Sequence, residues 1–399
     1  MIGLVFWSGV ALVLYVYAGY PLLALALSRL HGRGRPPVRQ DLPTVTLIVA
    51  AYNEEAVIGR KIAECLALDY PADRLDVIVA ADGSNDATAH IARSFGDGRV
   101  TVMHRPERRG KMAAIERAAA AASGEILVFS DANNRYAPDA VRRLVARFTE
   151  GVGMVTGRKT VETADGLGYS EGLYWRYESA IRSAETRLGI CVAWNGEILS
   201  VRRDLFEPAP RGFVNDDAWI AVQVLSGGHR IVYEPAAVSI ETVSSTAAEE
   251  RERRTRMFAG IWQMYAPSFV RSLPWRRPGA LFALVSHKML RPLVALGFVA
   301  IAGATVAALV DPPDAAGASA FWALAAPWNL AAAAGQAMVY GAAVVGPRIG
   351  GRFARIAYVP RFLLDANIAA LAGLRRQLQG GQSVTWTKAT RSEPAGTPS

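Results

Sequence analysis

The sequence contains only two cysteines among its 399 residues. Cys65 and Cys191 stand far apart, and neither has a second cysteine at metal-ligand spacing. This excludes a disulfide-stapled scaffold and the zinc sites that depend on paired cysteines. We expect both thiols to be reduced, which fits a cytosolic location for the segment between them.

Several chemical motifs are also missing. The chain has no His-x-Glu, Cys-x-x-Cys or Ser-His-Asp arrangement, no Gly-x-Gly-x-x-Gly and no P-loop lysine. Charged residues make up only 20% against 51% hydrophobic residues, and this balance excludes a disordered chain. The formal net charge of +9 is compatible with nucleic acid, a membrane surface or an anionic small substrate, so the distribution of the basic residues has to decide.

Three apolar runs predict membrane helices. Met1–Ser28 has no charged residue and favours a retained anchor over a cleavable signal peptide, which would have a basic start and a shorter apolar core. Pro292–Val310 and Ala315–Pro347 flank a short acidic turn at Asp311–Asp314. They predict a hairpin of two spanning helices, and two buried helices of a soluble domain are the alternative.

Basic residues near the ends of these runs predict the orientation. The N-terminus and the turn 311–314 carry none, so we expect both to face outside and residues 30 to about 280 to be cytosolic. The short apolar stretch 362–374 is interpreted as an interfacial or re-entrant helix rather than a fourth span. Much of the basic excess thus flanks the membrane, which favours lipid headgroups over nucleic acid as partners. These residues are Arg29, Arg33, Arg35, Arg39, Arg271, Arg276, Arg277, Lys288, Arg291, Arg348, Arg352, Arg355 and Arg361.

The middle of the chain alternates between strand and helix patterns. Short runs rich in β-branched residues predict buried strands, and apolar residues at helical spacing predict the helices between them. This alternation is typical of a parallel α/β sheet. The predicted strands are 45–51, 75–81, 100–103 and 126–130, and the predicted helices are 54–68, 88–95 and 111–122.

Polar clusters adjoin these predicted strands, at 52–55, 82–88, 108–111 and 131–134. Each cluster alone is an ordinary turn or helix cap. Ligands of parallel α/β sheets bind beyond the carboxyl ends of the strands, where four such clusters would meet. The sequence therefore predicts a ligand site at this edge of the sheet.

The ordered set of motifs resembles the membrane-bound family 2 glycosyltransferases, which are inverting, use nucleotide sugars and have the GT-A fold. Residues 49–55 (Val-Ala-Ala-Tyr-Asn-Glu-Glu) resemble the opening strand of the family, and 82–88 resemble its nucleotide-binding Asp-Gly-Ser motif. Gly110-Lys111 resembles the segment that closes over the nucleotide. The segments 286–291 and 384–391 are similar to those of one membrane-bound branch.

The resemblance implies a donor site whose residue types suit a sugar nucleotide. Carboxylates can accept hydrogen bonds from base N–H groups and ribose hydroxyls, and Glu54 and Asp82 are the candidates. A divalent cation stabilises a leaving diphosphate, and oxygen ligands select Mg²⁺ or Mn²⁺. The expected donor-binding residues are Tyr52, Glu54, Asp82, Lys111, Asp131 and Arg256.

Asp131 and Asn133 fall where the family has Asp-x-Asp and are the expected metal ligands. The amide oxygen of Asn133 coordinates but contributes no charge, so we expect weaker metal binding than with a second Asp. A helix cap before Pro138 is the alternative interpretation of this pair.

Residues 215–217 (Asn-Asp-Asp) fall where relatives carry Thr-Glu-Asp, whose last Asp is the general base. The resemblance implies that Asp217 takes the proton of the acceptor, with Asp216 as the second catalytic candidate or a cap of the following helix. The aromatic clusters at 174–177 and at Trp194, Asn195 and Gly196 are candidates to line the acceptor site. Packing in the core or at the membrane interface is an equal alternative.

Arg256 falls on the Arg of the Gln-x-x-Arg-Trp motif of processive members, which suggests a contact with the leaving diphosphate. A solvated helix with i,i+4 ion pairs is the alternative. Met257 stands where those relatives have the Trp that stacks on the acceptor sugar, which disfavours chain polymerisation.

The sequence thus predicts an α/β GT-A domain with one N-terminal and at least two C-terminal transmembrane helices in the inner membrane. The expected segments are an anchor (1–29), a basic linker (30–43), the catalytic domain (44–245), an amphipathic segment (246–291), a transmembrane hairpin (292–347) and an interfacial helix with a tail (348–399).

The expected reaction transfers a sugar from a nucleotide sugar, expected to be a UDP-sugar, to a lipid-linked or growing glycan. The alternatives are a polyprenyl-phosphate glycosyltransferase, a processive polysaccharide synthase and an inactive nucleotide-binding scaffold.

Overall fold

The computed structural model describes residues 1–34, 37–162, 167–242, 247–349 and 351–380, and the similar segment 384–391 lies outside them. The described residues form two compact units. The sheet unit contains Leu27–Glu250 and Tyr265–Ala283, and the helical unit contains Met1–Ala26, Arg251–Met264 and Leu284–Gly381. The predicted segment 246–291 has residues in both units.

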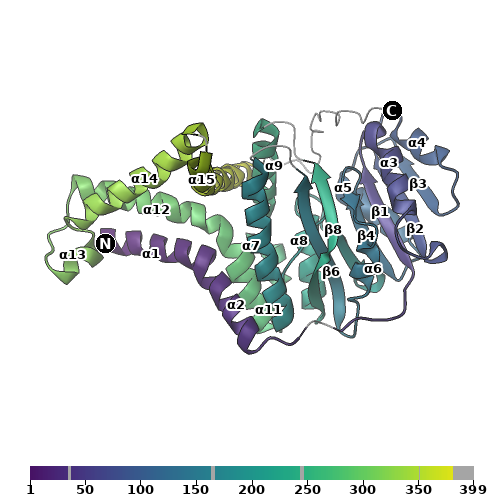
Figure 1. The fold of residues 1–399 in the computed structure, drawn as a ribbon, viewed down its shortest axis with the longest axis horizontal. Coiled ribbons are helices and arrows are strands. Elements are labelled where there is room, and N and C mark those ends of the chain that lie inside the picture. The colour runs from purple at the N-terminus through teal and green to yellow at the C-terminus, as the bar shows by residue number, and fades with distance from the viewer. Residues whose placement is uncertain (35–36, 163–166, 243–246, 350, 381–399) are drawn as a thin grey trace. The chain divides into compact units, whose positions relative to one another are not determined.

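The sheet unit is built on an eight-stranded sheet in the order β3-β2-β1-β4-β7-β6-β8-β5 (Figure 1). Its strands are β1 (Val45–Ala51), β2 (Leu75–Asp82), β3 (Val100–Arg105), β4 (Ile126–Asp131), β5 (Arg135–Tyr136), β6 (Val152–Glu162), β7 (Leu199–Arg202) and β8 (Arg230–Thr242).

The pairing of β1 fixes where the polar clusters meet. β1 is parallel to β2 on one side and to β4 on the other, with Ala51 opposite Ala81 and Ala50 opposite Asp131. The chain runs outward from β1 to β3 and then returns to the other side of β1, so a topological switch point lies between β1 and β4. The predicted parallel sheet is confirmed for β1–β4. β7 pairs antiparallel with β4 and with β6, and β5 pairs antiparallel with β8, which the sequence did not predict.

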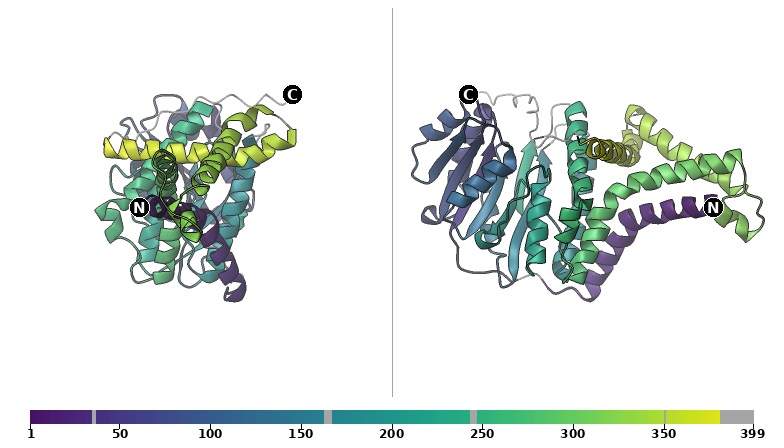
Figure 2. Two further views of the ribbon diagram at one scale, coloured as in Figure 1. Left: turned by 90° about the vertical axis from the view of Figure 1, so that its left-hand side faces the viewer. Right: turned by 180° about the vertical axis from the view of Figure 1, so that it is seen from behind.

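Helices cover both faces of this sheet, as the two further views show (Figure 2). The helices of the sheet unit are α3 (Glu55–Leu66), α4 (Thr88–Ser94), α5 (Lys111–Ala121), α6 (Ala140–Val145), α7 (Leu167–Leu188), α8 (Asp216–Ser226), α10 (Pro267–Arg271) and α11 (Pro278–Ala283). α5 packs on β1 and β2, while α7 and α8 pack on β6 and β8. Single-turn 3-10 segments lie at Ala72–Arg74 and Arg203–Leu205.

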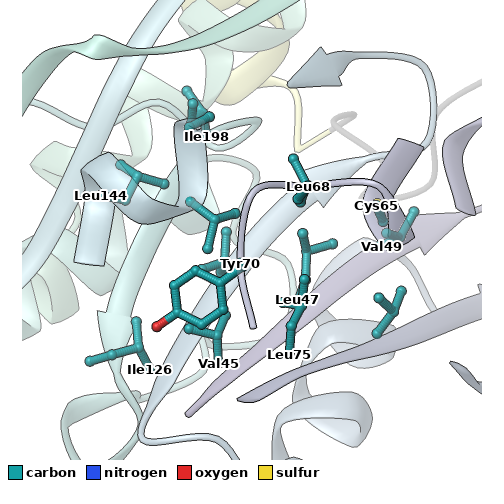
Figure 3. Close-up of a cluster of buried hydrophobic side chains, with 14 of the residues drawn as sticks. Val45, Leu47, Val49, Cys65, Leu68, Tyr70, Leu75, Ile126, Leu144 and Ile198 are labelled. Carbon is teal, nitrogen blue, oxygen red and sulfur yellow. The ribbon is translucent and has the colours of Figure 1, made fainter. Parts of the chain in front are cut away.

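The core explains why β1 is apolar along its whole length. Both faces of the strand are covered, so side chains pointing either way are buried. Val45, Leu47 and Val49 point into one cluster with Cys65 of α3 and Leu144 of α6 (Figure 3). Cys65 and Cys191 are both free and buried, as expected for reduced thiols.

The helical unit contains the N-terminal and C-terminal helices. The elements that lie wholly in this unit are α1 (Ile2–Leu14), the π-helical turns η1 (Tyr15–Gly19) and η5 (Leu284–Met289), α12 (Leu290–Val310), α13 (Ala318–Ala323), α14 (Trp328–Ile349) and α15 (Gly351–Leu378). Three elements belong to it in part: α2 (Tyr20–Leu30) up to Ala26, α9 (Ala247–Trp262) from Arg251, and the 3-10 turn Gln263–Tyr265 up to Met264.

Close contact between α1 and α12 depends on small residues. A Cβ on Gly9 would lie 2.9 Å from the carbonyl oxygen of Gly297 and 2.8 Å from Cγ1 of Ile301. Glycine at this crossing lets the two backbones approach closely, which is how apolar helices associate where there is little hydrophobic driving force. The indole of Trp7 donates to the carbonyl of Phe321 at 3.1 Å and so fastens α13 to α1.

Two helical runs, Ile2–Leu30 and Pro278–Val310, are long and apolar enough to cross a membrane. They contain the first and second predicted spans. The third run, 315–347, is not one helix, because α13 ends where Leu324 takes a left-handed conformation and α14 starts afresh at Trp328. Among the described residues α14 does not pass the same test. The stretch 362–374 is part of the 28-residue α15 rather than a short helix of its own.

Candidate active site

The predicted polar clusters meet at the carboxyl ends of β1, β2 and β4. The turns after β1 and β2 are joined directly, because Asn53 and Asn85 exchange hydrogen bonds of 2.8 and 3.0 Å. The N–H of Glu54 donates to Oγ1 of Thr88 at 2.7 Å, so the backbone of Glu54 is fixed at the start of α3. Residues of the two motifs thus hold the two turns in one frame.

Asp82 holds the loop before α5. Its carboxylate accepts the backbone N–H of Arg109 at 3.1 Å and that of Gly110 at 2.6 Å, and only 5% of the residue is exposed. Gly110 has a φ of 95°, a conformation that strongly favours glycine, and it places the first residue of α5 at the sheet edge. Asp82 therefore has a structural contact with the segment predicted to close over the nucleotide.

Tyr52 lies under the same loop. The guanidinium of Arg108 stacks on its ring, with Cζ 3.6 Å from the ring centre. A pocket lined by Tyr52, Asp82, Arg108 and Lys111 has only about 10 Å³ of free space, enough for about one water molecule. A nucleotide can enter here only if Arg108 and its loop move.

Lys111 and Asp131 form an ion pair across the switch point. Nζ of Lys111 lies 2.5 Å from Oδ1 of Asp131, with 21% and 36% of the two side chains exposed. Burial lowers the pKa of Lys111, but the carboxylates of Asp131, Asp216 and Asp217 outweigh it and the pKa is raised. For Asp131, burial raises the pKa and the lysine ammonium groups, Lys111 first, bring it below its ordinary value.

Asp217 lies in the first turn of α8, facing the loop before β7. Its Oδ2 accepts the N–H of Gly196 at 3.1 Å and its Oδ1 accepts the N–H of Ala218 at 2.9 Å. Burial and the neighbouring carboxylate of Asp216 raise the pKa of Asp217 to about 6, against the opposing effect of Lys111. Asp216 has a different contact, since its Oδ1 accepts the N–H of Asp217 at 3.0 Å. The raised pKa gives Asp217 the environment of a base for use near neutral pH.

Lys111 interacts electrostatically with Asp131, Asp216 and Asp217, so the structure brings the predicted metal ligand and the predicted bases to one place. Gly196 joins them through Asp217. The buried Nδ2 of Asn195 finds no hydrogen-bond acceptor among the residues that the structure describes. Arg256 belongs to the helical unit, and its contact with a diphosphate stays a prediction.

Sequence reasoning missed a buried ionic network beside Asp131. Lys159 on β6 contacts Glu197 at 3.1 Å and also contacts Glu241 on β8, and Nδ2 of Asn133 reaches Oε1 of Glu241 at 3.5 Å. These residues carry no motif. Their only signal is that charged residues occur within sheet-forming stretches, where charges are buried only when they are paired.

A second missed group is Lys61 on α3, which is 2% exposed. Its Nζ donates to the backbone oxygen and to Oδ1 of Asn134 at 2.8 and 2.9 Å. Asn134 also donates to the backbone oxygen of Glu197 at 2.7 Å. Asn134 therefore fixes the turn after β4, and Asp131 and Asn133 on this turn remain closer to the surface.

The oxygen donors present fit a divalent cation of the Mg²⁺ or Mn²⁺ type. Asp131 supplies a partly exposed carboxylate and Asn133 an amide oxygen, which are hard ligands. Among the described residues no group of three or more His, Cys, Asp or Glu side chains is placed to hold a metal. A cation here would therefore need further oxygen ligands, such as the phosphates of a nucleotide.

Comparison with known protein families decides the class of the chain. Residues 46–205 match the model of glycosyl transferase family 2, and residues 126–335 match that of glycosyl transferase family group 2. The chain belongs to glycosyltransferase family 2. The predicted family and the predicted transferase class are thereby confirmed.

Two curated relatives of this family 2 glycosyltransferase are bacterial proteins. The chain is 27% identical over 246 residues to the probable glycosyltransferase YdaM of Bacillus subtilis, covering 55% of this chain and 56% of that protein. It is 27% identical over 231 residues to an N-acetylglucosaminyltransferase of Rhizobium meliloti, covering 53% and 54%. The chain thus spans about half the length of the curated relatives it matches.

The fold has a known counterpart among solved structures. A mannosyltransferase from Pyrobaculum calidifontis, solved with GDP-Man and Mn²⁺, matches with a TM-score of 0.73 and 22% identity over 95% of this chain and 99% of that one. The likeness supports the predicted α/β fold of the GT-A type, with a sheet that is mixed rather than wholly parallel.

Proposed function

We propose that this family 2 glycosyltransferase is an inverting enzyme that moves a sugar from a nucleotide sugar, a UDP-sugar in the first instance, to a hydroxyl of a lipid-linked or growing glycan. The environment of Asp217 is the observation that carries the proposal. Its pKa of about 6 leaves it ionised at neutral pH and still basic enough to accept a proton. Inversion requires one such base on the side of the acceptor.

The residues of the donor site have separate tasks in this proposal. Tyr52 offers a ring face to the base after Arg108 has moved away, and Lys111 offers a positive charge to the diphosphate. A divalent cation on Asp131 and Asn133, when bound, neutralises charge that develops on the leaving phosphates. The acceptor hydroxyl is held beside Asp217 by Nδ2 of Asn195, and the lack of an acceptor for this atom among the described residues supports that role.

The chemistry proceeds by a single displacement. The acceptor oxygen loses its proton to Asp217 and bonds to C1 of the sugar while the C1–O bond to the diphosphate breaks. The electron pair of that bond leaves with the nucleoside diphosphate, so the configuration at C1 inverts. Lys111 is near enough to Asp217 to interact with it, which keeps base and donor phosphates in one site.

Membrane attachment is part of the proposal. The runs Ile2–Leu30 and Pro278–Val310 have the length and composition of spanning helices. We propose that they hold the enzyme in the inner membrane as a multi-pass protein with its sheet unit in the cytosol, where nucleotide sugars are made and lipid-linked acceptors are reached. α14 is proposed as a further, less apolar span.

The test is transfer of radiolabel from a panel of nucleotide sugars to membranes that contain the wild type or Asp217→Asn. We expect one donor to label lipid or glycan with release of nucleoside diphosphate. Loss of a general base costs about 10²–10⁴-fold in rate, and Asp217→Asn should show a loss of this size with nucleotide binding retained. Asp216→Asn should lose less.

If transfer occurs and neither substitution slows it, the acceptor needs no base, and a phosphate oxygen of a polyprenyl phosphate replaces the hydroxyl as the proposed acceptor. If no donor transfers label although nucleotide binds, the transferase proposal is contradicted in favour of a nucleotide-binding scaffold.

A further inference from the structure

We propose that Lys111 and the divalent cation compete for Asp131, so that the cation binds tightly only when a nucleoside diphosphate takes over the lysine. This inference rests on the proposed function. It adds an order to donor binding: in the absence of nucleotide, Lys111 is the counter-ion of Asp131, and diphosphate and cation then enter together.

The first observation is the ion pair itself. Oδ1 of Asp131, the carboxylate predicted to bind the cation, lies 2.5 Å from Nζ of Lys111. An oxygen in so short a contact with an ammonium group has its charge neutralised and its access to a cation reduced. A divalent ion near this ammonium group would also be repelled by it, because the site is partly shielded from water.

The second observation is that Asn133, the other expected ligand, does not replace the negative charge that Lys111 neutralises on Asp131. Asn133 contributes an amide oxygen without charge, and its Nδ2 is directed to Glu241 at 3.5 Å. Glu241 and Glu197 both contact Lys159, so these nearby carboxylates already have a cationic partner. Of the two expected ligands only Asp131 therefore carries negative charge, and Lys111 is paired with it. The carboxylates of Asp216 and Asp217 also attract Lys111 and are not among the expected ligands.

The third observation is that Lys111 lies at the N-terminus of α5, where a diphosphate could become its new partner. It is the first residue of α5, an 11-residue helix with no acidic residue in its first turn. The N–H groups at a helix N-terminus attract anions and disfavour a positive side chain, so the pair with Asp131 offsets an unfavourable position of Lys111. A diphosphate at this terminus would satisfy both the helix and the lysine. The flexible four-carbon stem of lysine allows such a change of partner.

The consequence is positive coupling between cation and nucleoside diphosphate. Each ligand removes an obstacle to the other: the diphosphate draws Lys111 away from Asp131, and the cation takes the vacated carboxylate. Coupling of this kind is reciprocal, so Mn²⁺ must tighten nucleotide binding by the same factor by which the nucleotide tightens Mn²⁺ binding.

The experiment measures Mn²⁺ affinity of the purified full chain in detergent by calorimetry and by the EPR signal of free Mn²⁺, alone and with saturating UDP or GDP. For the wild type we expect weak binding of Mn²⁺ alone and clear tightening with nucleotide. Lys111→Met should bind Mn²⁺ alone about tenfold more tightly or better, because a charge in contact with the ligand is removed. In the same variant the tightening by nucleotide should shrink.

Two control variants test whether the effect is specific to the charge of Lys111. Arg109→Gln removes a positive charge from the same loop at a side chain that pairs with Glu107 and is 51% exposed, and it should leave the affinity for Mn²⁺ alone within about twofold. Lys111→Arg keeps the charge and should keep the weak binding. Near-ultraviolet circular dichroism confirms that each variant is folded.

The variant Asp131→Ala distinguishes a failure of the proposed exchange from a failure of the proposed metal site. If it abolishes Mn²⁺ binding while Lys111→Met binds Mn²⁺ alone no more tightly than the wild type, the exchange is wrong and the proposed metal site stands. If Asp131→Ala binds Mn²⁺ as the wild type does, the cation is not at Asp131, and both the proposed site and the exchange are overturned.

Discussion

The backbone N–H of Gly196 donates a hydrogen bond to Oδ2 of Asp217 at 3.1 Å. Gly196 lies in the loop before β7, while Asp217 lies in the first turn of α8, so the bond sets the direction of the carboxylate from a second element. A Cβ on Gly196 would lie 3.2 Å from the same Oδ2. A Cβ at this position would therefore press on the carboxylate of Asp217.

Gly196→Ala should displace the carboxylate of Asp217 by a few tenths of an ångström. We expect kcat to fall about tenfold while the KM for the donor changes little, because orientation of the base and not donor binding is affected. Steady-state kinetics with the labelled donor measure both. Gly172→Ala is the matched control, because a Cβ there meets no atom within 4 Å, and its kinetics should equal those of the wild type.

The pH dependence of turnover should report Asp217. With a pKa of about 6 the carboxylate is protonated in acid and cannot accept a proton. We therefore expect kcat/KM to be constant above about pH 7 and to fall about tenfold per pH unit below about pH 5. The profile is measured at saturating cation. A profile that stays flat down to pH 4.5 would remove Asp217 from the role of base.

The stability of the folded chain should also depend on pH through Asp217. The pKa of Asp217 is raised from 3.8 to about 6 in the folded chain, so the folded state binds more protons than the unfolded one between these values. This contribution to stability is present below pH about 3.8 and is lost as the pH rises through about 6. Thermal unfolding of the wild type and Asp217→Asn at pH 4, 5, 6 and 7 measures it. The wild type should lose stability relative to the variant across this window, whereas a constant difference would contradict the shifted pKa.

Asp82 should act on the donor through the loop that it holds. Asp82→Ala removes the acceptor of the Arg109 and Gly110 N–H groups, and we expect faster hydrogen exchange at these amides and a KM for the donor raised about tenfold. Exchange measured by mass spectrometry reads the loop independently of activity. Glu107→Gln lies in the same loop on an exposed side chain and should change neither quantity. If the exchange rates are unchanged in Asp82→Ala, the loop is held by other contacts.

Membrane orientation is open to a direct test. The distribution of Arg and Lys predicts that reporters inserted near Gln40 or fused after Ser399 read as cytosolic, and that one at Asp311–Asp314 reads as external. An alkaline phosphatase and green fluorescent protein pair scores both outcomes. Activity of the C-terminal phosphatase fusion outside would mean that the number of spans is even, contrary to the prediction.

The sequence by itself determined the local elements of the sheet unit. Runs such as 45–51 are apolar and β-branched throughout, and strands buried on both faces need this pattern, so β1 begins and ends where the residues predict. The motif positions of Asp82, Asp131 and Asp217 also followed from the order of the residues. The third apolar run, 315–347, was predicted as one spanning helix, whereas the structure divides it between α13 and α14. Composition does not reveal that Leu324 takes a left-handed conformation and ends α13.

Only the tertiary structure decided which side chains share the site. Lys111 meets Asp131, and Gly196 meets Asp217, across 20 and 21 positions of sequence, through the order in which strands pair and helices pack. Neither periodicity nor propensity encodes that order, because both describe neighbours a few residues apart. Lys159, Glu197 and Glu241 carry no motif at all; burial with paired charges became visible only when β6, β8 and the loop before β7 were placed side by side. The residue types were present in the sequence, and long-range packing determined their partners and the raised pKa of Asp217.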